Sequence, residues 1–218
     1  MKKLAMFLAL ALICVPAFAT EFVNDKAPVL SVTAQETVHF YNDLNTSAGT
    51  GVKVEVKDVL LDNLVLRSGI EFNGVQLDYS AVRSDVTKLP LGIKGTTTTA
   101  FAGSEDLDSI VWSNEAGYDV NGSVFGATEK LDITPYIGVD SYFLNAGGAS
   151  QVDNTVGMSL GVDASYKVKE NIKLFAGLKY SWATADVTIN AANGSIAGQE
   201  GEVELDNFGL VGGASFSF

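Results

Sequence analysis

The most regular pattern in the chain is a strict alternation of apolar and polar residues toward its C-terminus. From Val156 to Val168, every second residue is apolar, and Gly, Ser, Asp or Lys stands between. A second run with the same period extends from Ile172 to Trp182. A period of two is typical of a β-strand with one apolar face. The first run is longer than the ~5–6 residues of a typical soluble strand and suits a tilted transmembrane strand of ~9–11 residues with a short extension.

Only Lys169-Glu170-Asn171 separates the two runs, which predicts a hairpin. Asp62-Asn63 precedes a similar run, so we expect a second short turn there. Extending the alternation along the chain predicts the strands 29–41, 51–61, 64–82, 108–120, 131–145, 155–168, 172–189 and 203–218. Bacterial membrane barrels have an even number of strands and short periplasmic turns. The pattern therefore predicts an all-β fold, an eight-stranded antiparallel up-and-down transmembrane β-barrel with both ends in the periplasm.

The connections between these strands differ in length and composition. Four of them, rich in Gly, Thr, Ser, Ala and Asn, are expected on the outside: 42–50, 83–107, 146–154 and 190–202. The segment 121–130 is a longer periplasmic connection than the others and fits the up-and-down scheme less well.

The alternation slips at Asn73-Gly74. Ile70 and Phe72 share one face, and the apolar positions then continue at Val75 and Leu77. Such a slip predicts a β-bulge. The alternative is a tight hairpin turn, because Asn-Gly favours type I′ geometry.

The N-terminus has the layout of a secretory signal peptide. Lys2 and Lys3 precede an uncharged apolar run, and Ala17 and Ala19 place small residues where a signal peptidase cleaves. The run is shorter than the ~20 residues that a transmembrane helix needs. We therefore expect a signal peptide at 1–19, cleavage after Ala19, and a barrel domain at 20–218 that is exported to the outer membrane.

Composition excludes several functions. Cys14 lies within the predicted signal peptide, so the mature chain would contain no disulfide and no thiolate metal site. Without Lys2 and Lys3, 12 basic residues stand against 26 acidic ones, a formal charge of −14. A nucleic-acid partner would require a basic patch, and none is visible.

The two faces of the predicted strands differ in chemistry. Aromatic residues gather on the apolar face, which predicts girdles at the membrane interfaces. Charges of both signs are predicted on the inward face, and the network that we expect comprises Lys53, Glu55, Lys57, Arg67, Glu71, Glu115, Asp163, Lys167, Lys173 and Lys179. The same face carries His39, Asp119, Asp132 and Asp140. Since buried charges must be paired and an eight-stranded barrel is only wide enough for side chains, we expect a filled interior. A narrow polar pore is the alternative.

The C-terminal strand ends in Phe216-Ser217-Phe218, with apolar or small residues alternating before it. This ending resembles the terminal strand that the bacterial barrel-assembly machinery recognises. The segment 134–139 (Thr-Pro-Tyr-Ile-Gly-Val) and the turn at Glu170-Asn171 resemble the small outer-membrane β-barrel family, which includes the transmembrane domain of outer-membrane protein A and opacity-type surface proteins. The resemblance covers about residues 51–218 and is architectural, so it implies a fold and brings no catalytic residue.

Little in the sequence supports catalysis. The chain has one histidine, His39, which is predicted to face the lumen, where it would not reach lipid. We therefore expect no enzymatic activity, no cofactor and no metal site. The acidic segments 105–108 and 200–204 could share divalent cations with lipopolysaccharide phosphates, although a solvated acidic surface explains them more simply.

The sequence thus predicts a small outer-membrane barrel with a structural and surface-interaction function. The barrel would maintain envelope integrity and display extracellular loops, and adhesion is one function expected of these loops. The expected partners are outer-membrane lipid and lipopolysaccharide, the barrel-assembly machinery and an extracellular ligand of the loops, with no nucleic acid. A narrow porin-like channel for small polar solutes or ions is the alternative function.

Overall fold

The computed structural model describes residues 28–41, 44, 46–58, 61–88, 94–146, 150–189 and 199–218. The wall of the barrel consists of β1 (Val29–Tyr41), β2 (Ser47–Lys57), β3 (Leu64–Lys88), β4 (Lys94–Tyr118), β6 (Leu131–Ala146), β8 (Thr155–Lys169), β9 (Ile172–Trp182) and β12 (Asn207–Ser217). The shorter elements are β5 (Val120–Asn121), the 3-10 helix η2 (Gly122–Phe125), β7 (Ser150–Val152), β10 (Thr184–Ile189) and β11 (Gln199–Glu204). Among the described residues, no helix has the length and hydropathy required to cross a membrane.

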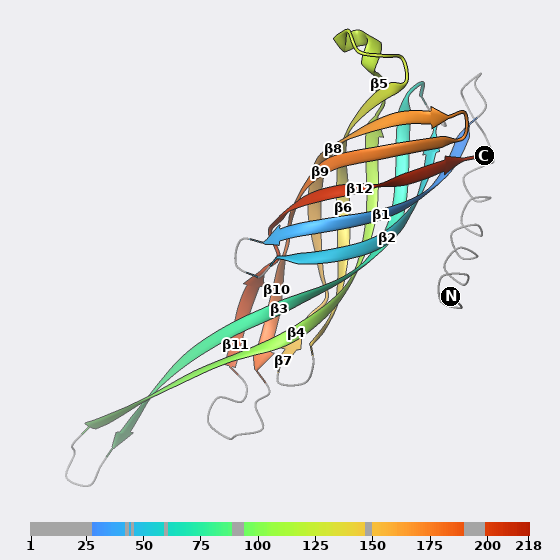
Figure 1. The fold of residues 1–218 in the computed structure, drawn as a ribbon. Coiled ribbons are helices and arrows are strands. Elements are labelled where there is room, and N and C mark those ends of the chain that lie inside the picture. Colours follow the sequence, from blue (N-terminus) through green and yellow to red (C-terminus); the bar gives the residue numbers. More distant parts are fainter. Residues whose placement is uncertain are drawn as a thin grey trace, which may run out of the picture.

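The eight wall strands close into an antiparallel barrel (Figure 1). β1 pairs with β12, from Ser31 opposite Ser217 to Tyr41 opposite Asn207, and this ladder joins the first and last strands. β4 pairs with β6 across the middle of the chain. The predicted eight-stranded up-and-down barrel is therefore confirmed, and full closure leaves the wall without an unpaired edge.

One end of the barrel carries both chain ends of the wall and the short turns. In the β2–β3 turn, Asp58 and Asn63 adopt positive φ angles of 63° and 64°, which these two residue types tolerate better than most others. The predicted turn at Asp62-Asn63 is thus confirmed. Since short turns of such barrels face the periplasm, this end is assigned to the periplasmic side. The segment 121–130 lies there and contains the end of β5 and the helix η2.

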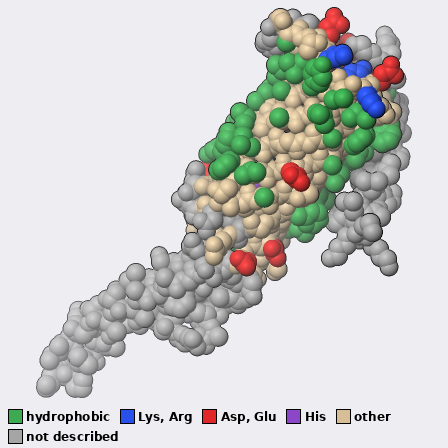
Figure 2. All heavy atoms as spheres, in the orientation of Figure 1, with side chains coloured by type: hydrophobic (Ala, Val, Ile, Leu, Met, Phe, Trp, Pro, Cys, Tyr) green, Lys and Arg blue, Asp and Glu red, His purple; other side chains and the backbone are tan. Residues whose placement is uncertain are grey.

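The outer surface of the barrel is apolar over most of its height. Exposed apolar side chains alternate with inward-facing ones along the wall strands, as Ile137 and Val139 do on β6. Hydrophobic side chains are spread over the face of the barrel that Figure 2 shows. Several exposed aromatic residues lie near the strand ends, among them Phe40, Phe208 and Phe143 at the extracellular end and Tyr118, Tyr166 and Phe216 at the periplasmic end.

The prediction of an outer loop at 83–107 is wrong. β3 and β4 pair without interruption from Leu64 opposite Tyr118 to Lys88 opposite Lys94. β2 accompanies β3 only as far as Asn73, and β6 accompanies β4 only as far as Leu107. Beyond these points the two strands form a ribbon that leaves the barrel on the extracellular side (Figure 1). We call residues 76–88 and 94–106 the β3–β4 ribbon.

The predicted β-bulge at Asn73-Gly74 is also wrong, and so is the alternative turn. Asn73 lies opposite Ser109 and Gly74 opposite Asp108 in one continuous register. A register irregularity occurs instead between Lys167 and Lys169, at the end of the β8–β9 ladder. The apolar positions change phase because apolar residues also occupy inward positions toward the extracellular end, as Val111 and Leu107 do on β4.

Two further strand boundaries differ from the prediction. The predicted strand 172–189 is divided at Ala183 into β9 and β10, and the predicted strand 203–218 begins as β11 and continues as β12. β10, β11 and β7 form a small separate sheet. Residues of the predicted loops 42–50, 146–154 and 190–202 therefore contribute to β2, β7 and β11.

Candidate functional site

The interior of the barrel is the most elaborate site in the molecule, and it is divided into a charged region and an apolar region. Because successive side chains of a strand point to opposite faces, inward residues alternate with the lipid-facing ones. The buried polar residues follow this alternation, as Ser31, Thr33, Gln35, Thr37 and His39 do on β1. Polar side chains therefore fill the lumen from the periplasmic end past its middle.

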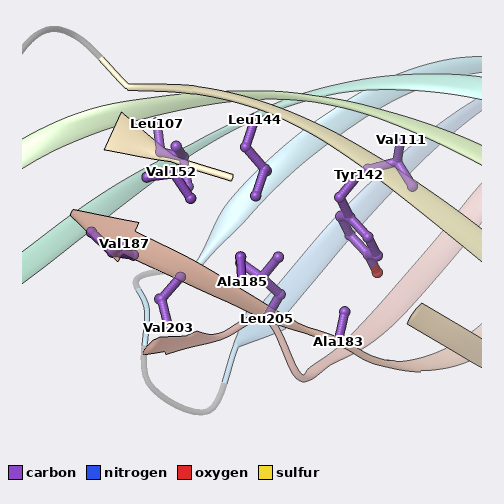
Figure 3. Packing of buried hydrophobic residues seen from close by; sticks show 10 residues of the cluster. All are labelled: Leu107, Val111, Tyr142, Leu144, Val152, Ala183, Ala185, Val187, Val203 and Leu205. Atoms are coloured by element: carbon purple, nitrogen blue, oxygen red, sulfur yellow. The ribbon is translucent and has the colours of Figure 1, made fainter. Parts of the chain in front are cut away.

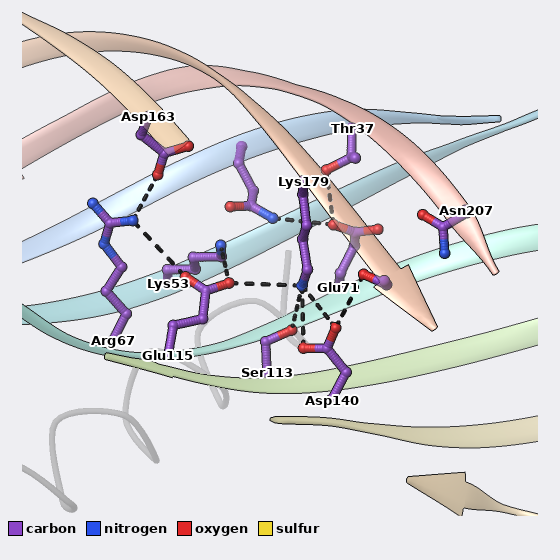
Figure 4. Close-up of polar contacts among 12 residues, drawn as sticks. Thr37, Lys53, Arg67, Glu71, Ser113, Glu115, Asp140, Asp163, Lys179 and Asn207 are labelled. Atoms are coloured by element: carbon purple, nitrogen blue, oxygen red, sulfur yellow. Dashed lines mark hydrogen bonds and ion pairs between the residues drawn. The ribbon is translucent and has the colours of Figure 1, made fainter. Parts of the chain in front are cut away.

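Arg67 on β3 lies between acidic residues of other strands, and Figure 4 shows its contacts with Asp163 and Glu115. Its Nε atom donates to Oε2 of Glu55 at 2.7 Å, and its Nη1 atom donates to Oδ2 of Asp163 at 2.6 Å. Glu55 is on the neighbouring strand β2, whereas Asp163 is on β8, across the lumen. The guanidinium group also lies 5.4 Å from the ring centroid of Tyr136. Its planar fork suits several simultaneous contacts of this kind.

A second group of charges surrounds Lys179 on β9. Its Nζ atom lies 3.0 Å from Oδ2 of Asp140, 3.6 Å from Oε1 of Glu115 and 3.2 Å from the hydroxyl oxygen of Ser113. Glu115 also accepts a hydrogen bond from Lys53 at 2.7 Å. The side chains of Glu115 and Asp140 have no exposed surface. These two acidic groups are therefore stabilised by paired cations and not by water.

Nearer the extracellular end, Glu71 accepts hydrogen bonds from Gln35 at 3.0 Å and from Thr37 at 2.8 Å. Its other carboxylate oxygen contacts Nε2 of His39, whose Nδ1 atom lies 2.9 Å from Oδ1 of Asn207. Both ring nitrogens of His39 thus have a partner within the barrel. A histidine engaged in this way has no nitrogen available to activate a nucleophile.

At the periplasmic end, Asp119 accepts hydrogen bonds from Lys57 and Thr134. Asp119 lies between β4 and β5, outside the wall strands. Burial alone would raise the pKa of its carboxyl group, but the hydrogen bonds from Lys57 and Thr134 and the nearby positive charges lower that pKa below its usual range. Lys173 donates to Asp132 at 3.1 Å at the same end. The predicted residue Lys167 lies exposed at the end of β8.

Little open space remains among these side chains. A cavity of about 30 Å³ lies in the periplasmic half of the lumen, between Gln35, Lys53, Arg67 and Asp163. One oxygen each of Gln35 and Asp163 is buried there without a protein partner. A space of this size accommodates about one water molecule. Within the described part of the chain, no group of His, Cys, Asp and Glu residues has the arrangement of a metal site.

Glycine residues make this crowding possible. An added Cβ atom at Gly161 on β8 would collide with the phenol group of Tyr136, and one at Gly177 on β9 would collide with the carboxylate of Asp163. Both glycines are at inward positions, where a large side chain from the paired residue of the neighbouring strand occupies the space that a methyl group would need.

Above the charged region, an apolar cluster lies at the extracellular end of the lumen (Figure 3). β4 and β6 contribute inward-facing side chains from the wall. The others come from β7, β10 and β11 and from Ala183 and Leu205, which lie next to β10 and β11. The buried members are Leu107, Val111, Tyr142, Leu144, Val152, Ala183, Ala185, Val187, Val203 and Leu205. We call this cluster the extracellular cap.

The cap exists because the β9–β12 hairpin continues beyond a break. β10 and β11 pair in the register of the hairpin below them, with Thr184 opposite Glu204. At the break, the backbone N–H of Leu205 donates to the carbonyl of Ala183 at 2.8 Å, and the carboxylate of Asp206 accepts from the N–H of Ala183 at 3.2 Å. β10 then pairs with β7, where Val187 lies opposite Val152. These contacts hold the upper hairpin against the wall.

The residues of the extracellular cap were not among the predicted site residues. The signal was present in the inward alternation of Ala183, Ala185 and Val187, which continues the phase of Lys179 and Ser181. The other predicted site residues lie elsewhere. Phe216 is exposed on the outer face of β12, and the N–H of Phe218 donates to the carbonyl of Leu30 at 2.9 Å. Ala17 and Ala19 lie outside the described residues.

The arrangement can be compared with known proteins. No protein-family model matches the sequence, and no curated protein matches it. The outer membrane protein OprG from Pseudomonas aeruginosa has a similar structure, with a TM-score of 0.59 at 12% identity over 91% of this chain and 99% of that chain. A major outer membrane protein from Thermus thermophilus matches with a TM-score of 0.52 at 16% identity, over 88% of this chain and 100% of that chain.

Fold and surface lead to one identification. At this level of identity the likeness concerns the fold alone. The apolar outer surface with aromatic residues near both ends is the surface of a barrel that spans a membrane. The chain therefore has the fold of the small eight-stranded β-barrels of the bacterial outer membrane, and that membrane is its location.

Proposed function

We propose that this protein is a structural and surface-interaction barrel, which spans the outer membrane without conducting and presents the β3–β4 ribbon to the outside. The observation that carries the proposal is the filled lumen. Ion pairs between Lys53, Arg67 and Lys179 and their acidic partners occupy the interior, and the extracellular cap covers the mouth above them. Since a conducting pore requires a continuous aqueous path, these two layers support a closed barrel.

The β3–β4 ribbon supports a function outside the membrane. Its strands pair with each other beyond the last barrel contacts at Asn73 and Leu107. With a rise of about 3.3 Å per residue, the ribbon would extend roughly 40 Å from the wall. A two-stranded hairpin is only marginally stable by itself in water. A partner on the cell surface, such as lipopolysaccharide sugars or an extracellular ligand, would stabilise it by packing against its faces or edges.

The proposal includes the route to the membrane. The signal peptide at 1–19 would direct export, with cleavage between Ala19 and Thr20. The exposed Phe216 and the terminal Phe218 would form the signal for the barrel-assembly machinery. No catalytic step and no cofactor belong to the proposed function.

Two experiments test the proposal. The refolded protein in a planar lipid bilayer should give no steady single-channel openings, and reproducible openings of one size would favour the narrow channel instead. For the surface function, bacteria displaying the wild-type protein are compared with bacteria displaying a variant in which residues 76–106 are replaced by an Asn-Gly turn. The probes are purified lipopolysaccharide and an array of surface glycans and matrix proteins.

We expect the shortened variant to remain folded, because its wall ladders are intact, and to lose the binding that the wild type shows. Heat-modifiable gel migration checks folding. Equal binding by both proteins, or binding by neither to any probe, would contradict the assignment of the interaction to the ribbon.

A further inference from the structure

One acidic side chain lies on the lipid-facing surface of the barrel. Glu36 is on β1, where the inward-facing residues are Gln35 and Thr37. Its side chain is therefore on the outer face, and it is exposed. Figure 2 shows an isolated acidic side chain over β1, far from the other charges of that face.

Glu36 lies at the middle of the hydrophobic band. On its own strand it is halfway between Val32 and Phe40. Its partner on β12 is Gly212, which is halfway between the exposed residues Phe208 and Phe216. Since aromatic residues mark the two membrane interfaces, the carboxyl group of Glu36 is at the depth of the lipid acyl chains.

A carboxyl group at this depth requires a partner. Among the described residues, no hydrogen bond or ion pair involves the side chain of Glu36. Within the barrel, the lysines and Arg67 face the lumen or lie near the periplasmic end, as Lys53 and Lys169 do. Arg83, Lys88 and Lys94 belong to the β3–β4 ribbon, beyond the barrel. Polar groups without partners are unfavourable in hydrocarbon, and ionisable groups in membrane segments are usually functional.

The neighbouring side chain supplies the complementary chemistry. Thr50 on β2 lies directly opposite Glu36 in the ladder and is also exposed on the outer face. Its hydroxyl group is a hydrogen-bond donor, and a carboxyl group is an acceptor. Two copies can face each other across a twofold axis that is parallel to the membrane normal and passes in front of β1 and β2. Glu36 of the first copy then faces Thr50 of the second, and Thr50 of the first faces Glu36 of the second. The face is thus complementary to itself, as an isologous interface must be.

The surface around this pair allows two barrels to approach closely. Gly212 has no side chain, and the flanking outward residues on β1 and β2 include Ala34 and Ala48. Small residues let backbones approach within a membrane, and polar residues then form hydrogen bonds across the contact. We propose that the β12–β1–β2 face binds a second copy of this chain through reciprocal Glu36–Thr50 hydrogen bonds at the middle of the membrane.

The test measures association of the mature chain in phosphatidylcholine vesicles. Fluorescence energy transfer between labelled copies gives the dimer fraction, and single cysteines at Ala48 or at Ile137 report which face is in contact. Ile137 is exposed on β6, on the opposite side of the wall. We expect concentration-dependent dimers and a disulfide cross-link at Ala48→Cys but not at Ile137→Cys. Glu36→Leu should weaken association at least about ten-fold through loss of both hydrogen bonds, whereas Glu36→Gln, which keeps an acceptor and a donor, should retain most of it.

The control is Asn114→Leu, which removes another outward polar group, on β4, where Asn114 accepts a hydrogen bond from Ser68 at 3.0 Å. It should leave association unchanged. Glu36→Leu should fold at least as well as the wild type, because it replaces a polar group by an apolar one in lipid. The proposal would be overturned if the wild type is monomeric or if Glu36→Leu associates normally. It would also be overturned if Asn114→Leu weakens association as much as Glu36→Leu does.

Discussion

Nη1 of Arg67 on β3 lies 2.6 Å from Oδ2 of Asp163 on β8, so that one ion pair connects two strands separated by β4 and β6 in the wall. Both side chains are almost completely buried. The contact links opposite parts of the wall directly, and it therefore stabilises the cross-section of the barrel as well as satisfying two charges.

Replacement of Arg67 by Ala should strongly destabilise the barrel. Glu55 and Asp163 would remain buried without their principal cation, and loss of one partner of a buried pair typically costs about 3–5 kcal/mol. Urea unfolding in lipid vesicles, followed by tryptophan fluorescence, measures the loss. The double variant Arg67→Ala/Asp163→Ala should lose less stability than the sum of the losses in Arg67→Ala and Asp163→Ala, because the two residues interact. Strict additivity would show that the pair contributes little.

Gly161→Ala should destabilise the barrel because the added methyl group would meet the phenol group of Tyr136. Overpacking of this kind costs about 1–3 kcal/mol. The matched control is Gly201→Ala on β11, where nothing lies within 4 Å of an added Cβ atom. A lower unfolding midpoint is expected for Gly161→Ala only. Equal unfolding midpoints for the two variants would mean that the space between Gly161 and Tyr136 accommodates a methyl group.

Leu205→Ala should open the extracellular cap without unfolding the wall. The side chain of Leu205 is only 2% exposed, and truncation of a buried leucine costs about 2–5 kcal/mol. Because β10 and β11 form a small separate sheet, the loss should appear as local opening. Amide hydrogen exchange should become faster in β10 and β11 and stay unchanged in β1. Val124→Ala, at a position that is 73% exposed, is the control and should change neither.

Acid should weaken the periplasmic contact between Lys57, Asp119 and Thr134. The pKa of Asp119 is lowered in the folded protein, so its stabilising contribution is present above the unfolded pKa of about 3.9 and is lost as pH falls toward the folded value. The unfolding midpoint of the wild type should therefore decrease below about pH 4 more steeply than that of Asp119→Asn. Parallel profiles would indicate that Asp119 does not contribute to this acid sensitivity.

The sequence by itself determined the strands that have one apolar face. The predicted range 29–41 coincides with β1, because apolar residues alternate with inward polar ones from Leu30 to Phe40 except at Glu36. The same alternation placed Lys53, Arg67 and Lys179 on the inward face. Period two is a local property of an extended backbone, so it is readable without knowledge of the neighbouring strands.

Other features depended on tertiary structure. The predicted loop 83–107 contains no regular alternation, yet residues 83–88 and 94–107 continue β3 and β4, because backbone hydrogen bonds between two strands do not require an apolar face. To predict the extracellular cap, one must know where the polar lumen ends, because Ala183 and Ala185 occupy the same inward phase as Lys179.

Contacts across the lumen were likewise decided by the closed barrel. The stagger and tilt of eight strands set which inward residues share one height, and a single sequence does not contain that relationship. The sequence could place Arg67 and Asp163 inside, but only the barrel brought them within 2.6 Å of each other.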